Sequence, residues 1–227
     1  MNRISSVVRM HLKDRLGWFM LPWAILGSSF VVNLGIASFV EEPITTGGLA
    51  SIYIYMIIAG IVSLVQTYPF AVGFTVRRQD YLVGTLATMA GISAFSAIVI
   101  VLLGAIEKET GWGVDLNFFN LGYLSDGNLL SQWWVHFGFM LSMLVGGFVI
   151  SSIHRKFGKN GMFAFFIAVS LILSVAIFIV SANDGWDAIG RWLKDHPPTA
   201  AELSTFMFLL SVIFGFVSHL LLRKAAA

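Results

Sequence analysis

The stretch FAVGFTVRRQDYLVGT, residues 70–85, places two arginines, an amide and an aspartate between two long apolar segments. The chain of 227 residues is 57% hydrophobic and only 11% charged, and its mean hydropathy is +0.84. Soluble domains carry about 25% charged residues, and so few charges cannot cover a solvated surface. The composition therefore predicts an integral membrane protein in which residues 70–85 contain a connection between two spans.

The apolar segments are long enough to cross a bilayer as helices. A helix needs about 20 apolar residues to cross a hydrocarbon core of about 30 Å. These segments predict an all-α, polytopic fold that forms a single transmembrane domain over residues 1–227. The six expected spans are residues 17–40, 49–73, 82–106, 131–153, 162–182 and 203–222. Transmembrane β-strands would instead alternate polar and apolar residues over about 10 positions.

The charged residues are sorted between alternate connections. Eleven of the fourteen lysines and arginines lie in the two termini and in the connections after the second and fourth expected spans. Ten of the twelve acidic residues lie in the other connections. Lysine and arginine in short loops set the orientation of membrane proteins. The sorting therefore predicts that both termini and the VRRQDY connection face the cytoplasm.

Two short segments outside the spans have amphipathic patterns. Residues 1–16 predict an interfacial helix with its apolar face in lipid, and that face consists of Ile4, Val7, Val8 and Leu12. Residues 183–198 predict a second short helix that rests on the outer leaflet and is stopped by Pro197 and Pro198. Thr199 and Glu202 have the spacing of a capping box that begins the last span.

Polar side chains within the spans are few. Asn33, Gln66 and His136 are the notable ones. Such residues could line a polar pathway, but more often they bond to a neighbouring helix, at about 0.6–2 kcal/mol each. The sequence leaves both interpretations open for these three residues.

Most catalytic and cofactor chemistry is not indicated. The chain has no cysteine, which excludes disulfides and thiolate metal sites. It has no phosphate-binding loop, because FGKNG at residues 157–161 lacks the required spacing. We therefore expect a protein that is not itself an ATPase or another enzyme, with no catalytic residue, no metal site and no nucleic-acid partner.

The connection YPFAVGFTVRRQDYLVGT, residues 68–85, resembles the first cytoplasmic loop of the permease subunits of bacterial type-2 ATP-binding-cassette (ABC) transporters, an exporter family. The shared pattern is an aromatic residue, a small residue and glycine, then a basic pair, an aromatic residue and a glycine, here Phe70, Gly73, Arg77, Arg78, Tyr81 and Gly84. Over the rest of the chain the resemblance is one of topology alone.

The resemblance implies a location in the bacterial cell membrane and a coupling helix between the second and third spans. That helix would dock onto a separate ATPase subunit, which would bind the ATP and magnesium. The implied docking residues are Phe74, Arg77, Arg78, Gln79, Asp80 and Tyr81. The N-terminal helix would pack beside the coupling helix, and residues 183–198 would match a re-entrant or surface helix. A second permease copy, or a paralogue, would complete the translocation pathway.

Other classes remain open. A stand-alone secondary transporter, channel or membrane sensor would also have many spans, although secondary transporters often show inverted repeats or broken helices. A membrane-embedded enzyme is the remaining class. Export itself follows from the resemblance, and no residue indicates the transported substrate.

Overall fold

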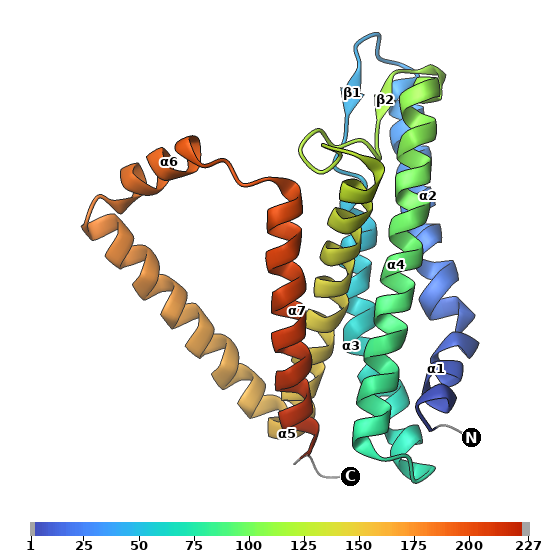
Figure 1. Ribbon diagram of the computed structural model, residues 1–227, viewed down its shortest axis with the longest axis vertical. Coiled ribbons are helices and arrows are strands. Elements are labelled where there is room, and N and C mark those ends of the chain that lie inside the picture. The colour runs from blue at the N-terminus through green and yellow to red at the C-terminus, as the bar shows by residue number, and fades with distance from the viewer. Residues whose placement is uncertain (1–2, 224–227) are drawn as a thin grey trace.

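The computed structural model describes residues 3–223, so expectations for residues 1–2 and for Lys224 lie outside the described residues. The fold is helical apart from two strands of two residues each (Figure 1). The elements are α1 (Arg3–Lys13), the π-helix η1 (Leu16–Met20), α2 (Leu21–Ala37), β1 (Ile44–Thr45), α3 (Ala50–Gly73), α4 (Arg78–Thr110), the 3-10 helix η2 (Gly111–Gly113), β2 (Leu116–Asn117), α5 (Leu129–Ala182), α6 (Gly185–Asp195) and α7 (Ala200–Arg223). The expected all-α class is confirmed.

Five helical stretches within the described residues are long and apolar enough to cross a membrane: Leu16–Ala37, Ala50–Gly73, Arg78–Gly113, Leu129–Ala182 and Ala200–Arg223. The stretch Leu129–Ala182 contains two of the six expected spans, residues 131–153 and 162–182. A straight helix of this length would extend about 80 Å, far more than a hydrocarbon core. However, Gly158 has φ 67° and ψ −170°, a conformation open essentially only to glycine. The helix breaks there, and the chain turns back on itself (Figure 1).

The two ends of the molecule carry opposite charges. The start of α1, the end of α7, the α3–α4 connection and the break in α5 lie at one end, and the two strands and α6 lie at the other (Figure 1). We call the first of these the basic end. The tertiary structure thus gathers the cations that the sequence had sorted into alternate connections.

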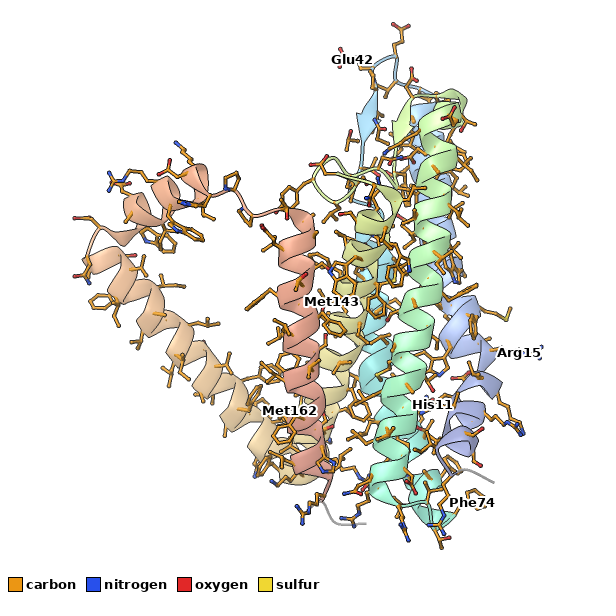
Figure 2. The ribbon with its side chains drawn as sticks, in the orientation of Figure 1. His11, Arg15, Glu42, Phe74, Met143 and Met162 are labelled. Carbon is orange, nitrogen blue, oxygen red and sulfur yellow. The ribbon has the colours of Figure 1, made fainter. Side chains whose placement is uncertain are left out.

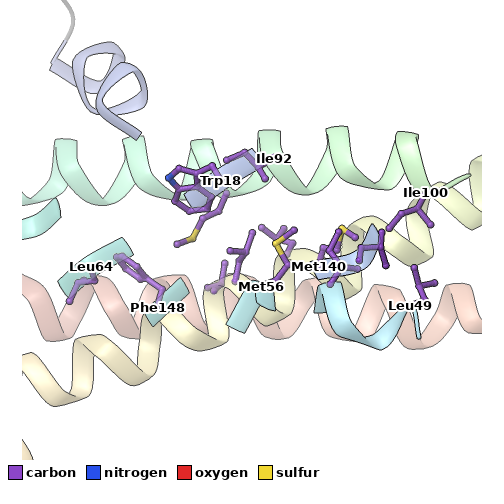
Figure 3. Packing of buried hydrophobic residues seen from close by; sticks show 14 of the residues in the cluster. Trp18, Leu49, Met56, Leu64, Ile92, Ile100, Met140 and Phe148 are labelled. Atoms are coloured by element: carbon purple, nitrogen blue, oxygen red, sulfur yellow. The ribbon is translucent and has the colours of Figure 1, made fainter. Parts of the chain in front are cut away.

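The main bundle packs around α3, α4, α5 and α7. Its apolar core includes Met56, Ile92, Met140 and Phe148 (Figure 3). The helices α3 and α5 approach so closely that a Cβ atom added at Gly147 would overlap the carbonyl oxygen of Ile57. Small residues at such crossings allow dense backbone packing without any water-driven hydrophobic term.

One helical segment leaves this bundle. The second part of α5, residues 159–182, diverges from α7 and is connected back to it by α6 (Figure 1). Its apolar side chains, from Phe163 to Ile179, are largely exposed. We call residues 159–182 the arm. A surface of this kind is stable only in an apolar solvent or against another apolar surface.

The end opposite the basic end is fixed by a buried carboxylate. Glu107 accepts hydrogen bonds from the backbone N–H groups of Phe118, Phe119 and Asn120, and from the indole of Trp112 at 2.8 Å. Nearby, β1 and β2 pair in parallel. Glu107 therefore anchors the long segment between α4 and α5.

The helix expected over residues 183–198 is α6, and the structure ends it at Asp195, before the two prolines. None of its residues is buried, and it does not turn back into the bundle (Figure 1). The capping box is confirmed: the Thr199 N–H donates to Glu202 at 2.8 Å, and the Glu202 N–H donates to Thr199 at 3.2 Å.

Candidate docking surface at the α3–α4 connection

The connection between α3 and α4 is a tight turn rather than a separate helix. The Thr75 N–H donates to the Val72 carbonyl, and the Val76 N–H donates to the Ala71 carbonyl, both at 3.0 Å. This pair of bonds is the Schellman motif, which closes a helix C-terminus. The expected coupling helix is therefore not formed as a separate element, because only four residues, 74–77, lie between the two helices.

Thr75 occupies the position in this motif that usually belongs to glycine. Its φ is 60°, a left-handed conformation that costs a residue with a Cβ atom roughly 1–2 kcal/mol. For a β-branched residue such a conformation is a true outlier. The surrounding hydrogen bonds hold the strained turn in one shape, so the side chains on it are presented rigidly.

Arg77 and Arg78 have different roles in the structure. Arg77 is the N-cap residue of α4 and is exposed. Arg78 is half-buried, and its guanidinium donates to the carbonyls of Leu222 at 3.4 Å and Arg223 at 3.1 Å. These carbonyls belong to the last turn of α7, where a cation also compensates the helix dipole. Arg78 thus fastens α7 to the start of α4.

The remaining predicted docking residues divide by exposure. Phe74 is 78% exposed and lies at the basic end (Figure 2), and Gln79 is also exposed. Asp80 is half-buried in the first turn of α4, where a carboxylate is favourable next to the helix N-terminus. The accessible part of the predicted surface is therefore Phe74, Arg77 and Gln79.

Tyr81 does not belong to this accessible surface. Its side chain is fully buried, its hydroxyl lies 2.8 Å from the hydroxyl of Thr67, and its ring packs against Tyr68. The prediction that Tyr81 contacts a partner is therefore wrong for this conformation. Tyr81 instead holds α3 against α4 directly behind the turn.

The N-terminal helix packs beside the turn, as expected. Val7 of α1 lies against Gly84, where an added Cβ atom would come within 2.7 Å of the Val7 Cβ. His11 is buried beside Trp18, and its Nε2 lies 3.0 Å from the Thr85 hydroxyl. The expected apolar face is divided: Val7 is buried against protein and does not face lipid, whereas Leu12 is exposed.

Burial changes the acid–base behaviour of His11. Desolvation lowers the pKa of its imidazole to about 4, although the nearby Asp14 carboxylate acts in the opposite direction. The ring is therefore neutral near pH 7 in the docked helix. Little in the sequence indicates this role: His11 follows Ile4 and Val7 at helical spacing, but histidine is not an apolar residue.

A groove lies directly beside the turn. It has a volume of about 290 Å³ and is lined by Arg77, Arg78, Gln79, Leu82, His219, Leu222 and Arg223. Its walls come from the start of α4 and the end of α7. Together with exposed Phe74, it gives the basic end a concave cationic surface next to an apolar projection.

The three polar residues of the spans are not brought together. Asn33 donates to the Ser29 carbonyl in its own helix at 2.8 Å. His136 is buried, and its Nδ1 lies 2.5 Å from the Tyr53 hydroxyl, which joins α5 to α3. Gln66 is exposed and lines a different groove, of about 260 Å³, with Asp14 and Tyr55. His136 therefore matches the expectation of a bond to a neighbouring helix, whereas Asn33 bonds within its own helix.

Comparisons of the chain with protein-family models, with curated protein sequences and with solved structures find no match.

Proposed function

We propose that this chain is the membrane permease subunit of an ATP-driven exporter of the ABC class, located in a bacterial cell membrane. In this proposal the chain crosses the membrane six times, with the arm as the fifth crossing. The basic end, with both termini, faces the cytoplasm, following the rule that lysine and arginine concentrate there.

The observation that carries the proposal is the pairing of an exposed aromatic residue with a cation on a rigid turn. A loop that only sets topology needs positive charge but no projecting apolar side chain. Phe74 is 78% exposed, and exposed Arg77 follows it by three residues. Aromatic residues and arginine are the groups most often responsible for binding energy at protein interfaces, so this turn is suited to dock onto the ATPase.

The contacts behind the turn support a role in transmitting motion. Arg78 fastens the end of α7 to the start of α4, and α1 packs on α4 through Val7 and His11. A displacement of the turn would therefore be passed to α1, α3, α4 and α7 together. Rigid-body movement of packed helices is a common form of coupled conformational change.

In this proposal the chain supplies the pathway and its partner supplies the chemistry. ATP and magnesium bind to the ATPase subunit, and this chain performs no catalysis. A second copy or a paralogue lies beside the first within the membrane, and the substrate passes at their shared interface. The resemblance of residues 68–85 to such permeases supports this assignment.

The test is co-purification of the tagged chain from its native membrane, with retained polypeptides identified by mass spectrometry. We expect a polypeptide with a nucleotide-binding Walker motif, and we expect Phe74→Ser/Arg77→Glu to lose it. Arg78 is left intact because its replacement would also release α7. The matched control is Phe39→Ser/Lys108→Glu, which removes an aromatic side chain and reverses one positive charge at two exposed positions, just after α2 and in the last turn of α4.

Equal retention of the ATPase by the turn variant and the control would refute docking at this turn. The alternative is a stand-alone secondary transporter, channel or sensor. Flux driven by a proton or sodium gradient, through the purified chain alone in vesicles, would favour that alternative and overturn the proposed function.

A further inference from the structure

An apolar groove lies between the arm and the main bundle. It has a volume of about 350 Å³, and among the described residues that line it Ser142 is the one with a polar side chain. The apolar lining includes Gly146, Ile153, Phe165 and Phe214. Water binds poorly in such a groove, because the lining offers too few hydrogen-bond partners. Hydrocarbon is the natural occupant if the arm lies in a bilayer.

Two lysines lie near this groove, at the point where the arm joins the rest of α5. Lys156 and Lys159 stand on either side of the break at Gly158, within two helical turns of the groove residues Ile153 and Phe165. The Lys156 ammonium lies 4.8 Å from the centre of the Phe157 ring, and the Lys159 ammonium lies 5.9 Å from that of Phe163. Both ammonium groups thus stand at the boundary between aromatic surface and the basic end.

Within residues 3–223, no carboxylate forms an ion pair with either lysine. The acids nearest to the basic residues in sequence, Asp14 and Asp80, lie after α1 and in the first turn of α4 rather than on α5. The neighbouring Arg155 is directed elsewhere, with its guanidinium 4.5 Å from the centre of the Tyr68 ring. A negatively charged group at Lys156 and Lys159 would therefore be strongly favoured.

We propose that an anionic phospholipid of the bilayer occupies this groove, with an acyl chain along Ile153, Phe165 and Phe214 and its phosphate at Lys156 and Lys159. Basic pockets between transmembrane helices on the cytoplasmic side are suited to anionic head groups. The lipid would fill the space between the arm and the bundle and so hold the arm apart. This inference rests on the proposed membrane embedding and orientation, but not on transport or on an ATPase.

Charge also decides between a lipid and a second copy of the chain in this groove. Two copies related by a two-fold axis along the membrane normal present the same surface to each other. Contact at the groove would bring Lys156 and Lys159 of both copies to the same depth and close together. Like charges in that arrangement repel, whereas a phosphate is attracted to the pair.

The proposal is tested by lipid retention in native mass spectrometry of the detergent-purified protein. Phosphatidylglycerol and phosphatidylcholine with identical acyl chains are added in separate titrations. We expect phosphatidylglycerol to bind on the order of 30-fold more tightly, because two lysines near a lipid surface together contribute about 2 kcal/mol. Lys156→Gln/Lys159→Gln should remove this preference, whereas Arg3→Gln/Arg9→Gln, which loses the same charge at the same end, should retain it.

A second variant tests the apolar part of the site. Gly146 lines the groove, and an added Cβ atom there would meet only Phe214, at 4.0 Å. Gly146→Leu should therefore fold, fill the groove and reduce the retention of both lipids. Independently of any variant, phosphatidylglycerol with a photoreactive acyl chain should cross-link the wild-type protein within residues 143–153, 165–166 or 207–214.

Three outcomes would overturn the proposal. They are equal affinity for the two lipids, equal loss of preference in both double variants, and cross-links confined to other segments. None of these outcomes bears on the turn at Phe74. Loss of the ATPase partner would conversely leave the lipid result unchanged, so the two proposals fail separately.

Discussion

Acidification should release α1 from the bundle through protonation of His11. The imidazole is buried between α1 and α4, where its Nε2 lies 3.0 Å from the Thr85 hydroxyl. Its Nδ1 is buried and has no hydrogen-bond partner. A charged imidazole at this position would lose its hydration and would have no carboxylate in direct contact to compensate. When α1 is undocked, the ring is in water and the charge is hydrated, so protonation favours the undocked state.

The magnitude follows from the two pKa values. Burial lowers the pKa of His11 from 6.5 to about 4, so the undocked state takes up the proton first as the pH falls. Docking is fully favourable above pH 6.5 and weakens as the pH drops from 6.5 toward 4. By proton linkage, the loss is about 2 kcal/mol at pH 5 and about 3 kcal/mol at pH 4. A loss of this size changes the docked-to-undocked ratio by roughly 30-fold at pH 5.

The assay is a distance measurement between two spin labels. The chain has no native cysteine, so Ser5→Cys on α1 and Ala87→Cys on α4, both at exposed positions, would carry the only labels. We expect one short distance at pH 7.5 and a growing population at longer distance below pH 6. With His11→Gln, which cannot take up a proton, the short distance should persist across this range.

Two results would refute this reasoning. One is a distance distribution in the wild-type protein that is unchanged down to pH 4.5. The other is the same pH-dependent release in the His11→Gln variant, which would assign the titration to a different group.

Three further substitutions test the backbone and the opposite end by thermal unfolding in detergent. Thr75→Gly should stabilise the protein by about 0.5–1 kcal/mol, since it removes the left-handed strain while adding unfolded-state entropy; a lower melting temperature would contradict the strain. Gly147→Ala should lower the free energy of unfolding by about 1–3 kcal/mol through overlap with α3. Its control, Gly146→Ala on the groove side, should be nearly neutral. Similar effects of the two substitutions would argue against the close α3–α5 crossing. Glu107→Gln should destabilise by about 2–3 kcal/mol, because an amide cannot accept all the N–H bonds that the carboxylate accepts. Exposed Glu109→Gln is its control, and equal melting temperatures for those two variants would refute the anchoring role of Glu107.

Features that depend on neighbouring residues could be predicted from the sequence. The apolar stretches, the helix α6, its end just before Pro197 and the capping box at Thr199 all follow from local composition and spacing. The expected spans also predict a connection between residues 153 and 162, and the break at Gly158 falls within it. The sequence does not show that this connection is a single glycine with positive φ between two otherwise continuous helical segments.

The docking surface could be predicted only in part, since sequence spacing does not reveal exposure. Phe74 and Arg77 are accessible as expected, whereas Tyr81 is buried against Tyr68. Nothing local distinguishes Tyr81 from Phe74, because both are aromatic residues next to the same charged stretch. The difference arises because one lies on the turn and the other faces α3.

By itself, the amino-acid sequence determined that this protein is helical and suited to a membrane. It also determined which connections carry the positive charge. Both properties depend only on the hydropathy and charge of residues that are close together in the chain. Only the tertiary structure decided that Arg78 closes the end of α7, 144 and 145 residues away, and that the arm stands apart from the bundle. Such contacts depend on which helix faces come together, and that is a property of the packed structure as a whole.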